Sequence, residues 1–341
     1  MMKLLLAFVV AGLLLLCAAY SILAYYRLVS IAREPYGWIR SWNFFQSAKT
    51  IASKLTPGAW KECNRRLFHH YQTLAPQLPD NFTEMEPLLL AVICGCDAGL
   101  FRETLHGVYI PRVQRGDSFF AARTLGARGA LLLVLAHFFE NRRWGSLVET
   151  RVEEHGLIAE DQFFILMQAG SYLTATRGYA APEARICYER AESLCNSLNR
   201  PLFLYAALMG QWRHSNTVGK LSEALQIAKR VYSLAEDHNE SVLLIGACHA
   251  LACTLYFLGE FVSARQYAMR AIQTWRSEGV QPAVEEVDVP ITSTLSFAAI
   301  SEWHLGEIPF CRATIAEAIS LAKRLNDIHG LVVDLVWAAI L

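Results

Sequence analysis

A short pattern that recurs along the second half of the chain constrains its fold most strongly. A turn glycine is followed five residues later by a small residue, and seven residues beyond that by another small or apolar residue. The clearest copies are Gly219 with Ala224 and Val231, Gly259 with Ala264 and Ala271, and Gly306 with Cys311 and Ala318. A further copy runs from Gly178 to Ala184 and Ala191, with one residue added in the turn. The small residues Ala184, Ala224 and Ala264 are 40 residues apart, and Cys311 follows 47 residues later.

This register predicts stacked helical hairpins. Residues seven apart share one helical face, so small side chains there let two helices approach closely. Glycine adopts the left-handed conformation that ends many helices. The intervening segments, such as 241–258 and 293–305, are apolar at helical spacing. We therefore predict an all-α solenoid of two-helix repeats and no strand-rich domain.

The register weakens upstream but is still visible. Gly99 to Thr104 repeats the turn, and Trp144 to Leu147, with Glu154, follows a helical segment in a similar way. Proline and glycine predict breaks at 76–79, 111–116 and 279–290, and the acidic residues of the last segment indicate an exposed loop.

The amino-terminal segment predicts a membrane anchor. Residues 4–26 carry no charge, and residues 4–24 would form a helix of about 31 Å, the thickness of a bilayer core. Basic residues are more frequent after this segment than before it, which places the body of the protein in the cytoplasm. Arg27, Arg33 and Arg40 follow the uncharged segment, whereas Lys3 precedes it. Tyr20, Tyr25 and Tyr26, and later Trp38 and Trp42, lie where an aromatic belt is expected.

Two alternatives compete with the single-anchor interpretation. A cleaved signal peptide would use residues 4–16 as its apolar core and Cys17 to Ala19 as its cleavage site, although the apolar run continues beyond that site. A lipoprotein at Cys17 would need a small residue where Leu16 stands. The uncharged stretch 242–258 could form a second span, but the repeat register explains it better as a buried repeat helix.

Composition excludes several classes of function. Lys plus Arg and Asp plus Glu number 31 each, so there is no excess charge to hold a nucleic acid. The abundance of apolar residues, 54% of the chain, argues against disorder. The nine cysteines are too sparse for a disulfide scaffold and include no CxxC pair, so we interpret most of them as buried, reduced thiols.

The hairpin register resembles tetratricopeptide (TPR) repeats in the longer form found in MalT-type regulators. The run 173–183 is similar to a segment of their repeat halves, and of predicted bacterial ATPases and cyclases with such repeats. Residues 59–71 and 108–116 are similar to the region after the nucleotide-binding domain of STAND-type signalling NTPases. The resemblance, over residues 57–341, implies a sensor or scaffold arm that binds a partner or inducer and regulates an attached ATPase or cyclase.

The chain departs from that family in lacking a phosphate-binding loop. In the nearest sequence, Gly219 to Ser222, Leu221 stands where a hydroxyl must follow the lysine, and His214 occupies the place of the first glycine. We therefore expect no ATPase activity, no cofactor and no enzyme of another class. The chain also stops within an apolar helix at Leu341, which suggests a fragment or a truncated gene product.

Several groups of residues could bind a metal or a ligand, and each group also has an interpretation in which its role is purely structural. Buried thiols are favoured over a zinc site for Cys94 with Cys96, and for Cys248, His249 and Cys253. An exposed helix face is favoured over a ligand patch for His69 and His70 beside Arg65 and Arg66, and over a phosphate site for Arg112, Arg115, Arg123 and Arg128. His137 and Glu140 lack a third metal ligand. Packing is favoured over a ligand groove for Trp212, Tyr256 and Trp303. Glycosylation at Asn81 or Asn239 would require a lumenal domain.

These expectations give one organisation. Residues 1–26 form a transmembrane anchor, 27–56 a juxtamembrane linker, 57–156 divergent helical repeats and 157–341 TPR-like repeats. We expect a single-pass membrane protein with a cytoplasmic scaffold that holds a protein or peptide partner in its concave groove, with binding residues that the sequence does not name. The alternative is a regulatory or sensor fragment of a STAND-type ATPase or nucleotide cyclase. A catalytic site, a metal site and nucleic-acid binding are not expected.

Overall fold

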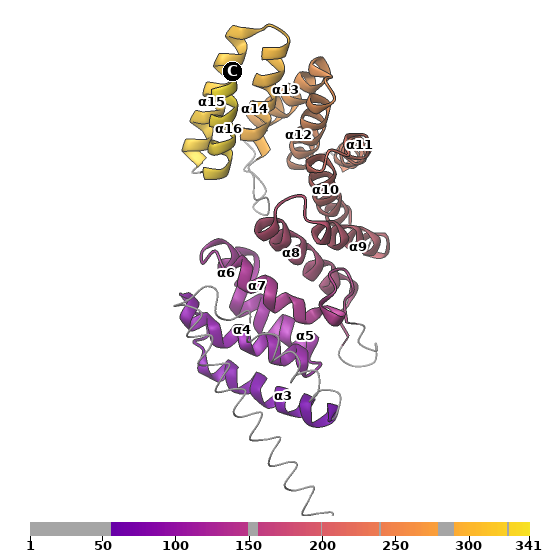
Figure 1. The fold of residues 1–341 in the computed structure, drawn as a ribbon, viewed down its shortest axis with the longest axis vertical. Helices are drawn as coiled ribbons and strands as arrows, with labels where there is room; N and C mark the ends of the chain where they lie inside the picture. The colour runs from indigo at the N-terminus through magenta and orange to yellow at the C-terminus, as the bar shows by residue number, and fades with distance from the viewer. Residues whose placement is uncertain (1–55, 149–155, 199, 239, 279–289, 326) are drawn as a thin grey trace, which may run out of the picture. The chain divides into compact units, whose positions relative to one another are not determined.

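The computed structural model describes residues 56–148, 156–198, 200–238, 240–278, 290–325 and 327–341 (Figure 1). The predicted anchor, the linker up to residue 55 and the loop 279–289 lie outside these residues. The chain divides into two compact units. The N-terminal unit comprises Met1–Ala127 with Thr150–Gly156, and the C-terminal unit comprises Arg128–Glu149 with Leu157–Leu341.

Every regular element in the described part of the chain is helical. The N-terminal unit contains α3 (Pro57–Leu74), α4 (Phe82–Asp97), α5 (Phe101–Thr104), a π-helix (Leu105–Gln114), a 3-10 turn (Gly116–Ser118) and α6 (Phe120–Arg123). The C-terminal unit begins with α7 (Arg128–Leu135) and two 3-10 turns (Ala136–Phe138 and Glu140–Arg142). It continues with α8 (Ala159–Arg177), α9 (Pro182–Leu198), α10 (Pro201–Thr217), α11 (Leu221–His238), α12 (Ser241–Phe257), α13 (Phe261–Glu278), α14 (Pro290–His304), α15 (Ile308–Leu325) and α16 (Ile328–Ile340).

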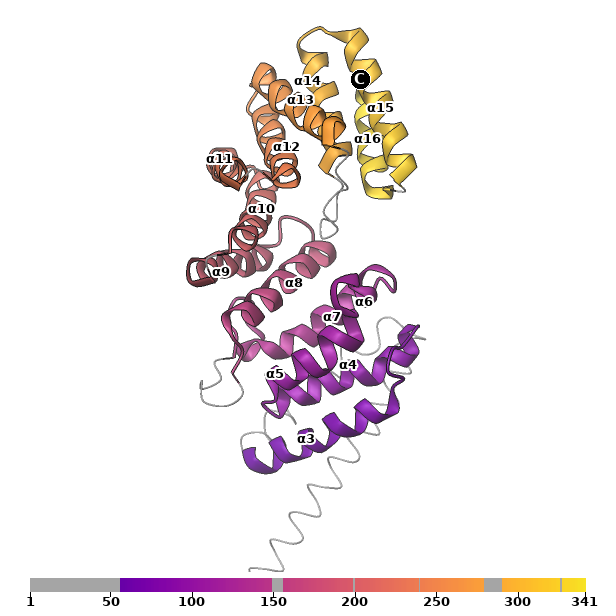
Figure 2. The same ribbon diagram turned by 180° about the vertical axis from the view of Figure 1, so that it is seen from behind.

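The helices of the C-terminal unit pack in consecutive pairs. Helices α8 and α9, α10 and α11, α12 and α13, and α14 and α15 form hairpins, and each hairpin also contacts the next (Figures 1 and 2). This arrangement is compatible with an α-solenoid, so the predicted all-α class and repeat-like packing are confirmed at that level.

The turn glycines end the first helix of three hairpins in the same way. Gly219, Gly259 and Gly306 have φ values of 77°, 81° and 77°. The amide that follows each glycine donates to the carbonyl five residues earlier, from Lys220 to Ser215, Glu260 to Leu255 and Glu307 to Glu302, each at 2.9 Å. This is the Schellman motif. Gly99 after α4 has the same pattern, as its upstream position predicts.

The small residues of the register lie where the hairpin helices meet. All of them are at most 1% exposed: Ala184, Ala191, Ala224, Val231, Ala264, Ala271, Cys311 and Ala318. Buried alanine and cysteine leave room for the larger apolar side chains of the facing helix, such as Leu295 and Ile315 in one shared cluster.

Arginine–glutamate pairs connect the second helices of successive hairpins. Arg230 on α11 binds Glu192 on α9 at 2.6 Å, and Arg270 on α13 binds Glu236 on α11 at 3.0 Å. Arg276 on α13 binds Glu317 on α15 at 2.7 Å. These side chains are about one-quarter to one-half exposed, so each pair contributes less than about 1 kcal/mol to stability and mainly favours one register between neighbours.

The break expected at 111–116 falls at the end of that range: Pro111 lies inside the π-helix (Leu105–Gln114), and the helix ends at Arg115, with φ of 55°. One sequence expectation differs from the structure. Gly145 has φ of 89°, but Leu147 pairs with Phe139 in an isolated bridge instead of starting a helix.

Within the described residues, no single helix is both long enough and apolar enough to cross a bilayer. One interrupted pair, Gly116–Arg123 with Arg128–Phe138, reaches the length only when its two pieces are counted together. Helix α12, which contains most of the uncharged stretch 242–258, is 17 residues long and packs against α11, α13 and α14. That packing supports its interpretation as a buried repeat helix.

Candidate binding site

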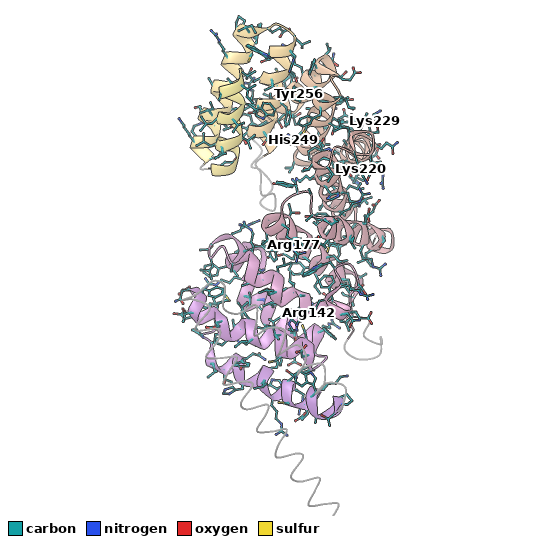
Figure 3. The ribbon with its side chains drawn as sticks, viewed as in Figure 1. Arg142, Arg177, Lys220, Lys229, His249 and Tyr256 are labelled. Atoms are coloured by element: carbon teal, nitrogen blue, oxygen red, sulfur yellow. The ribbon has the colours of Figure 1, made fainter. Side chains whose placement is uncertain are left out.

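A small pocket lies between the first helices of two successive hairpins. Its volume is about 150 Å³, and residues from α10, from α12 and from the turn after α8 line it. The lining residues are Tyr179, Met209, Trp212, Arg213, Asn216, Thr217 and His249. Figure 3 shows His249 and Tyr256 on α12, about two helical turns apart.

The Trp212 side chain is fixed by a hydrogen bond inside the helix pair. Its indole Nε1 donates to Thr254 Oγ1 at 2.9 Å, and Thr254 in turn donates to the Ala250 carbonyl at 2.8 Å. Trp212 is 4% exposed, and its ring contacts His249 edge-to-face at 5.7 Å. The Trp212 indole is therefore held in one orientation in the wall of the pocket.

His249 is a neutral polar group in the pocket. Its Nδ1 hydrogen-bonds with Thr294 Oγ1 on α14 at 3.0 Å, and its ring also contacts Phe297. Burial, and secondarily the charge of Arg213, lowers the pKa of His249 to about 3. The imidazole therefore carries no charge at neutral pH.

Two further side chains make hydrogen bonds that position the polar rim of the pocket. His214 Nδ1 donates to the Tyr179 carbonyl at 3.2 Å, which ties the turn after α8 to α10. Burial lowers the pKa of His214, so this contact forms with the neutral ring. Asn216 Nδ2 donates to Cys253 Sγ at 3.4 Å, which places its amide against α12. The rim thus consists of polar groups from three elements.

The size and composition of the pocket limit what it can bind. A volume of about 150 Å³ equals roughly five water molecules and is below the roughly 300 Å³ at which small-molecule sites begin. The described lining residues combine apolar and polar side chains. The pocket suits one side chain or terminal group of a larger partner, with an apolar body and a polar end.

The three aromatic residues considered for a groove have different environments. Trp212 lines the pocket, whereas Tyr256 lies in an aromatic cluster between α12 and α14 and its hydroxyl is 3.3 Å from His304 Nε2. The imidazole of His304 stacks on Phe261 at 4.2 Å. Trp303 is 39% exposed, so it packs less completely than the sequence predicted.

The cysteines considered as metal ligands are buried thiols. Cys94, Cys96, Cys248 and Cys253 are at most 7% exposed, and none of the eight described cysteines forms a disulfide. Burial raises the pKa of Cys248 and of Cys253 to about 12. Among the described residues, no group of three or more His, Cys, Asp or Glu side chains is placed to hold a metal ion.

The basic and histidine-containing face of α3 is exposed. Glu62 binds both Arg65 and Arg66 at 2.8 Å, and these hydrogen bonds lower the pKa of Glu62 to about 2. His69 and His70 are also exposed on this helix. The arrangement matches the favoured interpretation of an amphipathic helix face.

His137 and Glu140 do not share a helical turn. His137 lies in one 3-10 turn and Glu140 in the next, with the extended residue Phe139 between them. The nitrogen Nε2 of His137 lies 3.5 Å from Arg142 Nη2. The helical spacing that suggested a pair of metal ligands is absent.

The four arginines considered together have separate roles. Arg112 is 6% exposed, and its guanidinium donates to the carbonyls of Gln72, Ala75, Pro76 and Gln77 at 2.9–3.3 Å. Arg112 therefore provides hydrogen-bond donors for the backbone carbonyls at the end of α3 and in the turn after it. Arg115 binds the Pro79 carbonyl and Asp80, Arg123 lies over the Phe119 ring, and Arg128 begins α7.

The sequon residue Asn81 caps a helix. Its Oδ1 accepts from the Glu84 amide at 3.0 Å, and its Nδ2 donates to Glu84 Oε1 at 2.8 Å. The pattern of Asn followed three residues later by Glu is the sequence signal for this cap. Asn239, in the other sequon, lies outside the described residues.

Sequence reasoning missed Arg213, Tyr179 and Met209 as pocket residues. The sequence offered one partial signal, the position of Trp212 near the end of a repeat's first helix. Neither a family model nor a curated protein sequence matches this chain.

Proposed function

We propose that this chain is an interaction scaffold in which TPR-like helical hairpins hold a protein or peptide partner against the first helices of the repeats. The observation that carries the proposal is the pocket between α10 and α12, set in an array of regularly packed hairpins. Extended arrays of this kind offer surfaces rather than enclosed catalytic clefts. The missing phosphate-binding loop agrees with a binding role.

The hydrogen bonds around the pocket support a binding site. Trp212, His249 and Asn216 are each held by a partner on a neighbouring helix, so little side-chain freedom remains to be lost when a partner binds. Thr217 is exposed and offers the open edge.

The proposed location is the membrane, with residues 4–24 as a single span and the repeats in the cytoplasm. The uncharged amino-terminal segment and the basic residues after it support this. Extraction of cell membranes with alkaline carbonate should leave the full chain in the pellet. Release of the chain by carbonate would contradict the anchor.

Selection from a random dodecamer peptide display library tests the binding function. The detergent-solubilised full chain should enrich related peptides that fail to bind a Thr217→Trp variant, whose larger side chain obstructs the open edge of the pocket. Lys229→Gln, on the exposed surface of α11, is the control and should bind as the unmodified protein does (Figure 3). Failure to enrich peptides, or equal binding by Thr217→Trp, would contradict the proposal.

A further inference from the structure

We propose that the exposed apolar face of α16 binds a helix of a partner protein that carries small residues seven apart, the pattern of this chain's own second helices. The inference goes beyond the proposed function, since it concerns a surface other than the pocket between α10 and α12. It depends on three observations: the composition of the exposed face, the counterpart of that face on α12, and the helix that covers the counterpart.

The exposed face of α16 is apolar along its length. Helix α16 packs on α14 and α15, and on its buried side Ser296 Oγ of α14 donates to Asp334 Oδ1 at 2.6 Å (Figures 1 and 2). Among the described side chains of the helix, the exposed ones are Val332, Leu335, Val336, Ala339 and Ile340. The four larger ones are 49–65% exposed, and spacings of three and four residues place them on one helical face. A contiguous apolar face of this kind marks an interaction surface.

The repeat identifies the counterpart of this face on α12. Helix α12 begins at Ser241 and α16 at Ile328, 87 residues later, and an asparagine stands two residues before each start. The buried side agrees with this alignment, because Ala247 and Asp334 occupy the same position and both are fully buried. On the exposed side, the corresponding pairs are Ile245 with Val332, Cys248 with Leu335, and Ala252 with Ala339. The three residues on α12 are at most 6% exposed.

A second helix of the register covers these positions on α12. Ile245 and Cys248 share one apolar cluster with Ala271 of α13. Ala252 lies in a neighbouring cluster with Ala268 of α13. Because the α13 residues are alanines, the two helices approach closely and bury the whole face. The exposed face of α16 is therefore equivalent to a surface that a helix like α13 covers.

The side chains of α16 define what the partner helix carries. Leu335 stands where α12 has the smaller Cys248, so a helix that covers it at the same separation needs small residues at the contact. This chain's own second helices are not available to another copy, because the register residues of α11, α13 and α15 are at most 1% exposed within their hairpins. We therefore assign the occupant to a partner protein instead of a second copy of this chain.

Two matched peptides test the inference on the detergent-solubilised full chain. One has the sequence of α13, residues 261–278, and the other carries Ala264→Leu, Ala268→Leu and Ala271→Leu; both are labelled with fluorescein. By fluorescence anisotropy, the α13 peptide should bind at least about 10-fold more tightly, since the added side chains of the leucine peptide prevent close approach. Non-specific apolar association predicts the reverse order, because the leucine peptide is the more hydrophobic. Binding in that reverse order, or no binding of the α13 peptide, would overturn the inference.

Substitutions in the full chain assign the binding to α16. Leu335→Lys and Val332→Lys each place a charge on the face and should weaken binding of the α13 peptide by about 10-fold or more, because an apolar contact is lost. Leu74→Lys is the matched control, since Leu74 on α3 is 56% exposed against 49% for Leu335, and it should leave the affinity unchanged. Thermal unfolding of each variant at the temperature of the unmodified protein shows that the fold is retained. Folded Leu335→Lys and Val332→Lys variants that bind as the unmodified protein does would refute a site on α16.

The remaining outcomes separate the occupants of the face. Without peptide, the full chain and its Leu335→Lys variant should sediment alike in analytical ultracentrifugation. A dimer of the full chain that Leu335→Lys abolishes would make a second copy the occupant and overturn the assignment to a partner protein. Failure of the α13 peptide to bind overturns only the inference about α16, because the selection that tests the pocket depends on Thr217.

Discussion

Substitution of Gly210 by alanine tests how closely the repeat helices approach each other. Gly210 lies on α10 and faces the buried ring of Tyr188 on α9. A Cβ atom at Gly210 would lie 2.5–2.6 Å from three atoms of that ring. Ordinary contacts begin at about 3.4 Å, so one of the two groups must move by nearly 1 Å.

The ring has little room to retreat. Gly170, 40 residues earlier on α8, approaches the same ring, and a Cβ atom there would lie 2.7 Å from it. Overpacking of a filled core lowers the free energy of unfolding by about 1–3 kcal/mol. The higher helix propensity of alanine relative to glycine raises it by about 1 kcal/mol. Because both sides of the ring are occupied, we expect the upper part of this range, a net loss of about 2 kcal/mol.

Urea unfolding of the full chain, followed by far-ultraviolet circular dichroism, measures this loss. Gly129→Ala is the matched control, since a Cβ atom there meets nothing within 4 Å, and it should leave stability unchanged or slightly raised. A Tyr188→Leu change should reduce the cost of Gly210→Ala in the double variant. A Gly210→Ala protein as stable as the unmodified chain would refute the close approach of α9 and α10.

Three further predictions concern single side chains. Arg112→Met should destabilise the N-terminal unit by about 2–3 kcal/mol, because buried carbonyls lose a charged donor, and hydrogen exchange at the end of α3 should increase. Asp334 is fully buried, and burial raises its pKa from 3.8 to about 6, so stability should fall as pH rises between about 4 and 6. Asp334→Asn should remove that fall and raise the free energy of unfolding at pH 7 by up to about 3 kcal/mol, while keeping an acceptor for Ser296. Among the described thiols, the partly exposed Cys63 should react first with a maleimide at pH 8, and Cys187, Cys248 and Cys253, each with its pKa raised to about 12 by burial, should react only on unfolding, as mass spectrometry of labelled peptides would show.

The parts of the fold that depend on local patterns could be predicted from the sequence. The turn at Gly219 and the burial of Ala224 and Val231 follow from one short pattern, because the left-handed turn and the seven-residue face are properties of a single helix pair. The break at 111–116 was predicted, but not its position at Arg115, since proline in a π-helix is indistinguishable by sequence from proline at a break.

Contacts between segments that are distant in the sequence could not be predicted from it. Arg112 resembled a solvent-exposed arginine, and only the fold brings it to carbonyls about 35–40 residues away. The pocket likewise joins Tyr179, Trp212 and His249, which come from three elements. Helical periodicity describes the faces of one helix, so it does not tell which faces of successive repeats form a pocket.

Photocrosslinking in membranes tests the central claim most directly. A benzophenone amino acid placed at Thr217, on the open edge of the pocket, should form adducts with a protein or peptide partner in cells that express the full chain. The same amino acid at Lys229, exposed on α11, should not form those adducts. Adducts at position 229 but not at 217, or none at either position, would contradict a scaffold that holds its partner at α10 and α12.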